Sequence, residues 1–250
     1  IFITELLSSI SFSTVSFEYD VIVIVFFVLF AIVSLSVFIF KSRKFALMTI
    51  MISVSFIIIS HLCIDILSKD NISVTVFTGK YSSVVIEKSD IITVIGKDGK
   101  KQEDAVYRYL SNKGKKEIDT LVITSNSQYY IASYDDVFYD IDVGNVLISD
   151  KSGIPDMTVM GCNPETYQDK LVLEYDDYII TIDNDNIYID YKDFSMLCIE
   201  KSEFENKDYS VVFFEKHPEF ISSGYLLEDS ETKYGYEIIS DGDKIKVVEL

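Results

Sequence analysis

Histidine is scarce in this sequence, with two residues in a chain of 250, and cysteine occurs only three times. The cysteines form no CxxC pair and show no Cys/His spacing typical of a zinc site. After residue 67 the one histidine is His217, no Gly-x-Ser-x-Gly elbow accompanies any serine, and GKYSS lacks the spacing of a phosphate-binding loop. These absences argue against zinc, serine-hydrolase and P-loop chemistry, and His217 fits a surface or packing residue better than a ligand.

Positive charge is also in short supply, because 22 Lys and Arg face 40 Asp and Glu, for a net charge of −18. After residue 67 the counts are 19 against 36, a net charge of −17. Such a surface repels nucleic-acid phosphates unless positive charge is concentrated locally. The one notable concentration runs from Lys97 to Lys116, and the four acids within or beside it favour a solvated helix face over a phosphate-binding patch.

Two long apolar runs stand near the start of the chain. Val21–Phe40 has 20 residues without a charge, and Phe45–Leu67 has 23 residues that are uncharged until Asp65. Each matches the roughly 20 residues that cross a hydrocarbon core of about 30 Å. The first run is longer than the apolar region of a cleaved signal peptide and is followed by a second run. The pattern therefore predicts a multi-pass protein of the cell membrane.

The charges around these runs predict an orientation. Residues 41–44, KSRK, carry three positive charges and should stay cytoplasmic, which places residues 68–250 on the extracytoplasmic side. Because the chain starts with Ile rather than Met, residues 1–20 are interpreted as an extracytoplasmic segment of a fragment. Residues 21–67 would form a two-helix transmembrane hairpin, and residues 70–250 one extracytoplasmic domain.

Residues 70–250 contain short β-branched and aromatic runs separated by turn signals. Ile72–Thr78, Ser83–Lys88, Asp90–Gly96 and Ile118–Thr124 are predicted strands, and the last is apolar on both faces, as in a central, covered strand. Residues 103–114 have apolar positions at helical spacing and end in Gly114. The later strands suggest consecutive antiparallel pairing. Low proline and steady strand spacing argue against a disordered stalk, and the pattern predicts an α+β layered domain.

Three smaller features remain open at the level of sequence. Cys162 and Cys198 fall in a compartment that permits a disulfide, but spacing does not establish that their α-carbons are close. Asp183–Asn186, DNDN, lacks the glycine and terminal glutamate of an EF-hand loop and fits a solvated turn better than a calcium site. Tyr129 and Tyr130 suit a half-buried strand end better than a base-stacking platform.

Four stretches, taken in order, resemble the C-terminal region of ComEC-type DNA-internalisation (competence) membrane proteins, over about residues 10–250. They are VTVFTGKYSSVVIE, DIITVIG, AVYRYLSNKGKKEIDTLVIT and YEIISDGDKIKVV. The third is the strongest match, to the family's helix, glycine turn and Leu-Asp-x-Leu-Val strand. Gly79 remains from the family's Asp-Val-Gly-Gln-Gly-Asp turn. In the family's strand-Asp-Thr-Gly motif, Val94 replaces the aspartate and Gly96 remains.

The resemblance implies a fold class of α+β, with two transmembrane helices followed by a strand-rich, metallo-β-lactamase-like αββα sandwich. It also places the family's metal loop, Thr-His-x-Asp-x-Asp-His-x-Gly-Gly, directly after Thr124. The two glycines become Ala132 and Ser133. The family's metal-binding His, Asp, Asp and His are replaced by Ser125, Ser127, Tyr129 and Tyr130.

Serine hydroxyls and tyrosine phenols do not replace imidazoles and carboxylates that hold a divalent ion and activate water. The resemblance therefore implies a pseudoenzyme without a metal or cofactor, in a protein for DNA uptake across the cytoplasmic membrane. Its partners would be single-stranded DNA, the lipid bilayer, and upstream channel helices or other competence proteins. The alternative is a membrane-anchored extracytoplasmic binding or scaffold module unrelated to transport, whose acidic surface suits a cationic partner better than DNA.

Overall fold

The structure is a computed structural model, and it describes residues 48, 51, 55, 70–78, 83–96, 100–124, 131, 134, 136–150, 159–199, 204, 207–214, 223–228 and 234–250. The chain divides into two compact units, Ile1–Lys69 with Asn112–Gly114, and Asp70–Ser111 with Lys115–Leu250. Every strand described below belongs to the second unit.

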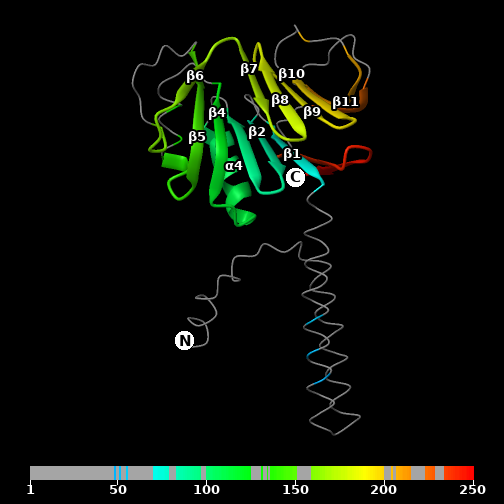
Figure 1. The fold of residues 1–250 in the computed structure, drawn as a ribbon, viewed down its shortest axis with the longest axis horizontal. Helices are drawn as coiled ribbons and strands as arrows, with labels where there is room; N and C mark the ends of the chain where they lie inside the picture. The colour runs from blue at the N-terminus through cyan, green and yellow to red at the C-terminus, as the bar shows by residue number, and fades with distance from the viewer. Residues whose placement is uncertain are drawn as a thin grey trace. The chain divides into compact units, whose positions relative to one another are not determined.

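The first sheet has eight strands in the order β14-β13-β1-β2-β3-β4-β5-β6 (Figure 1). Their bounds are β1 Ile72–Phe77, β2 Ser83–Lys88, β3 Ile91–Gly96, β4 Glu117–Ile123, β5 Asp142–Ser149, β6 Glu165–Tyr167, β13 Gly235–Ser240 and β14 Ile245–Glu249. From β14 to β3 the strands pair antiparallel. The helix α4 (Lys100–Asn112) connects β3 to β4, so these two strands run parallel, and β5 and β6 continue in that direction.

The second sheet has six strands in the order β12-β11-β10-β9-β8-β7. Their bounds are β7 Lys170–Glu174, β8 Tyr178–Asp183, β9 Asn186–Tyr191, β10 Phe194–Ile199, β11 Tyr209–Phe214 and β12 Ser223–Glu228. Strands β7 to β10 pair antiparallel through short turns. Strands β10, β11 and β12 pair parallel.

The predicted antiparallel pairing of the later strands is therefore correct for β7 to β10 and for β13 with β14, and wrong for β5 and β11, which pair parallel with β4 and β10. The physical reason is that side-chain alternation is the same in both pairing directions, whereas the length of the connection decides between them. The two-residue turn at Asn184 and Asp185, both with positive φ, requires an antiparallel hairpin. The connection from Ile199 to Tyr209 is long enough to return the chain to the same end of the sheet.

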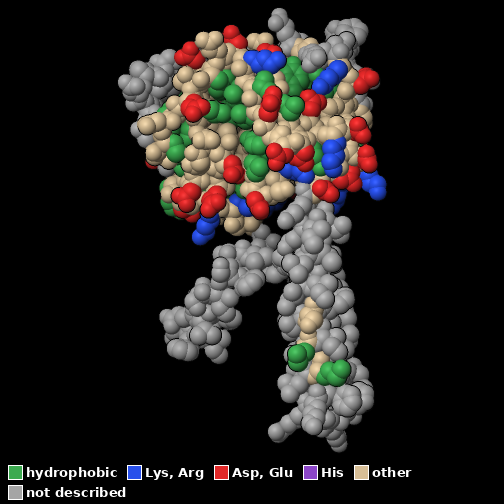
Figure 2. Space-filling model, viewed as in Figure 1, with side chains coloured by type: hydrophobic (Ala, Val, Ile, Leu, Met, Phe, Trp, Pro, Cys, Tyr) green, Lys and Arg blue, Asp and Glu red, His purple; other side chains and the backbone are tan. Residues whose placement is uncertain are grey.

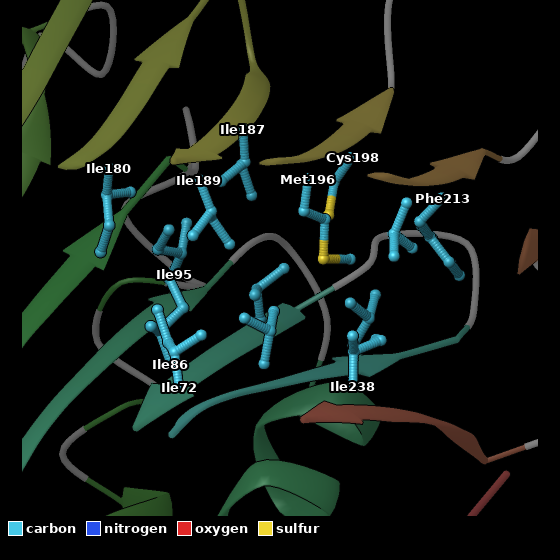
Figure 3. Close-up of a cluster of buried hydrophobic side chains, with 14 of the residues drawn as sticks. Ile72, Ile86, Ile95, Ile180, Ile187, Ile189, Met196, Cys198, Phe213 and Ile238 are labelled. Atoms are coloured by element: carbon cyan, nitrogen blue, oxygen red, sulfur yellow. The ribbon is translucent and has the colours of Figure 1, made fainter. Parts of the chain in front are cut away.

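The two sheets bury a common core of mostly β-branched side chains (Figure 3). Alternate residues of each strand enter it: Val74 and Val76 from β1, and Ile180 and Ile182 from β8, are at most 2% exposed. A fully buried aliphatic side chain of this size contributes about 1.5–3 kcal/mol relative to an exposed one. This layer is the main hydrophobic interface between the sheets.

A second core lies on the opposite face of the first sheet, under α4. Val106 and Leu110 of the helix pack with Val94 and Leu121 of the sheet, all at most 1% exposed. The helix ends where the Lys115 N–H donates to the Leu110 carbonyl at 2.9 Å and Gly114 adopts a φ of 68°. Strands β3 and β4 are thus covered on both faces, as the doubly apolar pattern of residues 118–124 predicted.

The predicted strands at Ile72–Thr78, Ser83–Lys88, Asp90–Gly96 and Ile118–Thr124 agree with β1 to β4 to within one residue at each end. The helix predicted over residues 103–114 begins three residues earlier and ends two residues earlier. Cys162 and Cys198 are free thiols. Cys198 lies in the core between the sheets, and Cys162 lies beside the core under α4, so the two side chains belong to separate layers.

The predicted fold class, two transmembrane helices followed by an αββα sandwich, is corrected. The described residues form a strand-rich pair of sheets with one short helix, α4, and no helix in this part of the chain is long and apolar enough to cross a membrane. Within the described residues α4 covers the first sheet and no helix covers the second. The predicted spans, Val21–Phe40 and Phe45–Leu67, lie outside the described residues except for Met48, Met51 and Ser55, which are helical.

Ile179 and Ile180 allow a matched test of this architecture, because they are neighbours on β8 that point to opposite faces. Ile180 is 0% exposed in the core between the sheets, and Ile179 is 41% exposed. We expect Ile180→Ala to lower the free energy of unfolding by about 2–5 kcal/mol, since it leaves a cavity in the core. Ile179→Ala should change it by roughly 0.5 kcal/mol. Equal losses in chemical denaturation would contradict the assigned register.

Candidate functional site

The candidate site lies where the parallel strands β3, β4 and β5 end. Register pairs Gly96 with Ile123 and Ile123 with Ile148, so the carboxyl ends of these strands meet at one edge of the first sheet. The Thr124 N–H donates to the Gly96 carbonyl at 3.0 Å, and the Thr124 hydroxyl approaches the same oxygen at 3.3 Å. In open α/β sheets this edge is where ligands usually bind.

The four positions predicted to replace the family's metal ligands are Ser125, Ser127, Tyr129 and Tyr130, and all four lie outside the described residues, as does His217. Their interpretation as a lost metal site stays a prediction. The residues on either side of this loop are described: Thr124 is buried before it, and Ile131 and Tyr134 are helical and buried after it. Among the described residues, no group of three or more His, Cys, Asp or Glu side chains could hold a metal ion.

Tyr134 fills the space beside the end of β3. Its side chain is 1% exposed and its ring stacks on Phe138, with ring centroids 5.6 Å apart and planes at 30°. A Cβ atom built on Gly96 would lie 1.8 Å from the Tyr134 hydroxyl oxygen and 2.8 Å from Cζ. Gly96 is therefore required here because the phenol occupies the volume that any side chain would need. Val94, at the aspartate position of the family motif, is 1% exposed in the core under α4.

Sequence reasoning identified Gly96 but not Tyr134, the residue that explains it. The available signal was the spacing of Tyr134 and Phe138, four residues apart, which places two aromatic rings on one helical face. That signal indicates a buried aromatic pair but does not identify the glycine that the pair approaches. The contact joins segments that are 38 positions apart, and only the folded sheet brings them together.

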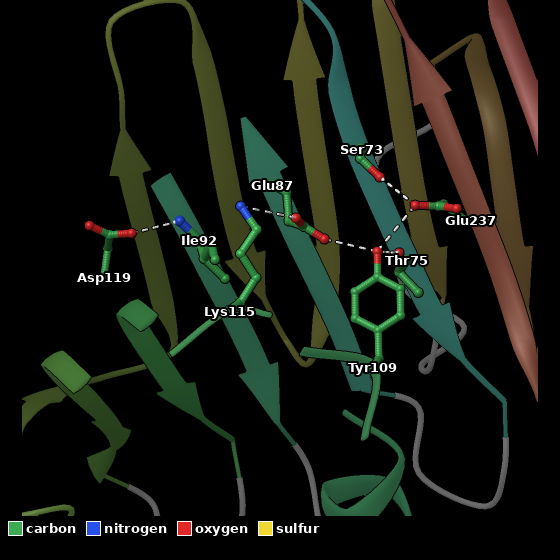
Figure 4. A network of polar contacts seen from close by, with 8 residues as sticks. All are labelled: Ser73, Thr75, Glu87, Ile92, Tyr109, Lys115, Asp119 and Glu237. Atoms are coloured by element: carbon green, nitrogen blue, oxygen red, sulfur yellow. Dashed lines mark hydrogen bonds and ion pairs between the residues drawn. The ribbon is translucent and has the colours of Figure 1, made fainter. Parts of the chain in front are cut away.

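A polar network joins α4 to the sheet on the same face (Figure 4). The Thr75 hydroxyl donates to the Tyr109 hydroxyl at 2.8 Å, and Tyr109 lies 2.8 Å from a Glu87 oxygen and 3.2 Å from a Glu237 oxygen. The phenol has one proton for two carboxylates, so the shorter contact with Glu87 is the better bond. Glu237 also accepts from the Ser73 hydroxyl at 3.2 Å, and Lys115 lies 3.9 Å from Glu87.

This network anchors the helix. Asp119 adds a related contact, because its carboxylate accepts the Ile92 N–H at 2.7 Å and ties β4 to β3 (Figure 4). The ring of Tyr109 also packs edge-on against Phe77, with centroids 5.5 Å apart. These partners belong to the sheet, to α4 or, for Lys115, to the turn between α4 and β4, so these contacts hold the helix on the sheet.

Two tyrosines, Tyr167 and Tyr178, have phenol pKa values above the ordinary value, so both are protonated at neutral pH. Burial raises the pKa of the Tyr178 phenol above its ordinary value, and the Tyr175 ring stacks on it with centroids 4.4 Å apart. Burial also raises the pKa of Tyr167, with a smaller contribution from Asp185. A protonated phenol is neutral and is a weaker nucleophile than its anion.

Two further acidic positions lie within the described residues, at Asp183–Asn186 and at Asp177. Asp183–Asn186 contains the hairpin turn between β8 and β9, so the predicted turn is confirmed, whereas Asn184 is exposed and Asn186 is buried. Asp177 pairs with the buried Lys88 at 3.3 Å. No protein-family model matches the chain, and no curated protein matches its sequence.

The fit between Gly96 and Tyr134 predicts a non-additive pair of substitutions. We expect Gly96→Ala to lower the free energy of unfolding by about 1–3 kcal/mol, because the new methyl group clashes with a buried phenol. In a Tyr134→Phe background, which removes the nearest oxygen, the same change should cost less, by about 0.5 kcal/mol or more. Four denaturation curves complete this cycle, and strict additivity would show that the two residues do not meet.

Removal of one hydroxyl tests the helix anchor. Tyr109→Phe should lower the free energy of unfolding by about 1–3 kcal/mol, because it leaves two partly buried carboxylates without their shared donor. The matched control is Tyr139→Phe, since Tyr139 is 74% exposed and its hydroxyl lies 3.5 Å from that of Tyr107. The control should change stability by roughly 0.5 kcal/mol. A Tyr109 variant as stable as the control would contradict the anchoring role.

Proposed function

We propose that the two-sheet unit is a non-catalytic domain of a ComEC-like protein for DNA uptake across the cytoplasmic membrane. The observation that carries the non-catalytic part of the proposal is the contact between Tyr134 and Gly96. In the family that the sequence resembles, the loop after this strand holds the metal. Here the space beside the strand end contains a buried, stacked tyrosine.

The physical consequence is that the Tyr134 ring fills space at this edge, in addition to the predicted replacement of the metal ligands. A hydrated divalent ion needs several oxygen or nitrogen ligands and room for water. At this edge the described groups include the Tyr134 phenol, the Phe138 ring and the hydroxyl of Thr124, which already contacts the Gly96 carbonyl, with Ser149 and Asp150 at the end of β5.

The role in DNA uptake rests on the resemblance. In that role the unit would lie on the extracytoplasmic side, next to the lipid bilayer and to upstream channel helices or other competence proteins. Single-stranded DNA would pass through the channel, and strand cleavage would be lost or supplied by another protein. The sandwich would then act as a rigid support for the channel.

A second function is favoured by the acidic surface. Residues after position 67 carry a net charge of −17, and Figure 2 shows Asp and Glu spread across the visible face with fewer Lys and Arg. Such a surface attracts cationic partners and repels DNA phosphates. The alternative proposal is therefore an extracytoplasmic binding or scaffold module for a cationic partner, unrelated to transport.

Metal content and nuclease activity test the non-catalytic role. We expect the full chain, incubated with zinc or manganese and then dialysed, to retain far less than one ion per chain. The same samples should leave single-stranded and duplex DNA intact. Tyr134→Ala measured beside the wild type shows whether removal of the ring opens a site. A stoichiometric ion in the wild type, with cleavage of either DNA, would overturn the proposal.

Natural transformation in the host distinguishes the two functions. Deletion of the gene should abolish DNA uptake if the chain supports transport, and a copy with the Tyr134→Phe substitution should restore it because no catalysis is lost. Normal transformation after deletion would remove the transport role and leave the binding module. Transformation frequency is the measurement.

A further inference from the structure

A groove of about 330 Å³ lies on the outer face of the second sheet, over β7, β8 and β9. Thr181 and Tyr188 line it, and their strand neighbours Ile180, Ile182 and Ile189 point the other way into the core between the sheets. The volume is near the lower end of the range for small-molecule sites, roughly 300–1,000 Å³. The groove belongs to the second sheet, whereas the Gly96 contact belongs to the first.

One wall of the groove is held by its own ion pair. The Lys207 ammonium lies 2.9 Å and 3.2 Å from the two carboxylate oxygens of Asp190. The same ammonium lies 5.3 Å from the centre of the Tyr209 ring. These contacts fix the orientation of the Lys207 side chain, and its positive charge offsets the negative charge of Asp190.

The other wall offers polar groups to a ligand. Lys170 and Asp183 are directly opposed on β7 and β8, and Thr181 and Asn184 lie beside them. Within the described part of the chain, these four side chains make no hydrogen bond or ion pair. They present an ammonium donor, a carboxylate acceptor, and a hydroxyl and an amide that can each donate and accept.

The groove is balanced in charge, although the domain around it is acidic. Two lysines and two aspartates line it, whereas residues after position 67 carry a net charge of −17. A cation would gain more from the acidic surface elsewhere, and an anion would be repelled on approach. The electrostatics of this wall therefore suit a ligand without net charge that is rich in donors and acceptors.

Two aromatic residues complete the groove. Phe204 is partly buried, and Tyr188 is 9% exposed, so each presents a limited edge to the groove. Aromatic edges supply apolar contact beside hydrogen-bonding groups. We propose that this groove binds a neutral saccharide of one or a few sugar units.

The chemistry of a sugar matches each part of the groove. Its hydroxyl groups can donate to Asp183 and accept from Lys170, with Thr181 and Asn184 serving either role. Its C–H groups can contact the limited edges of Phe204 and Tyr188. The proposal goes beyond the non-catalytic role and does not depend on it, because it requires neither DNA nor the Tyr134 contact.

The test is binding of a panel of neutral di- and trisaccharides to the full chain, by saturation-transfer NMR followed by titration. The panel contains oligomers of glucose, galactose, mannose and N-acetylhexosamines. We expect at least one to bind, and Asp183→Asn to weaken its affinity about tenfold through loss of a charge-assisted hydrogen bond. Lys170→Met should weaken it by a similar factor.

The matched control is Glu174→Gln, since Glu174 is exposed on β7 but does not line the groove. It should leave the saccharide affinity unchanged, and circular dichroism checks that all variants fold. Absence of binding by every saccharide would overturn the proposal. So would binding that Asp183→Asn and Lys170→Met do not alter, or binding of a lysine tripeptide probe in place of any sugar. Each of these results is independent of the metal and nuclease assays.

Discussion

The architecture depends on a first sheet that is apolar on both of its faces. Val74 and Val76 of β1 face the second sheet, whereas Val94 and Leu121 face α4. Neither face can be left in water without losing the burial that stabilises the fold. The second sheet covers one of these faces and buries it. The helix, with the aromatic pair Tyr134 and Phe138, satisfies the other. The remaining features of the molecule are arranged around this requirement.

The same requirement shapes the edge where a metal loop would stand. A catalytic loop needs polar ligands and water at the strand ends, whereas a stable cover needs an apolar surface there. In this chain the cover extends to the end of β3, where Tyr134 meets Gly96. The polar groups of this layer, such as Tyr109 and its carboxylate partners, join helix to sheet. The described part of this edge is thus formed by aromatic packing beside the end of β3.

Local pattern was enough to predict β1 to β4 and the central, covered place of β4. These features depend on alternation and on residues close in sequence. Pairing direction in β11 and β12, the contact of Tyr134 with Gly96, and the groove beside Lys207 and Asp190 depend on which distant segments meet. Sequence alone does not determine which distant segments pack together, because the same strand pattern is compatible with several pairing partners.

The pairing of β1 with β13 has a consequence for how the chain folds. Ser73 and Glu237, which share a hydrogen bond across this pair, are 164 positions apart. At a synthesis rate of about 5–20 residues per second, β1 waits on the order of ten seconds before its partner is made. Until then one edge of the β1–β2 hairpin presents unpaired backbone groups that can join another chain. The completion of this pair by β13 therefore closes an edge that would otherwise be open to pairing between copies of the chain.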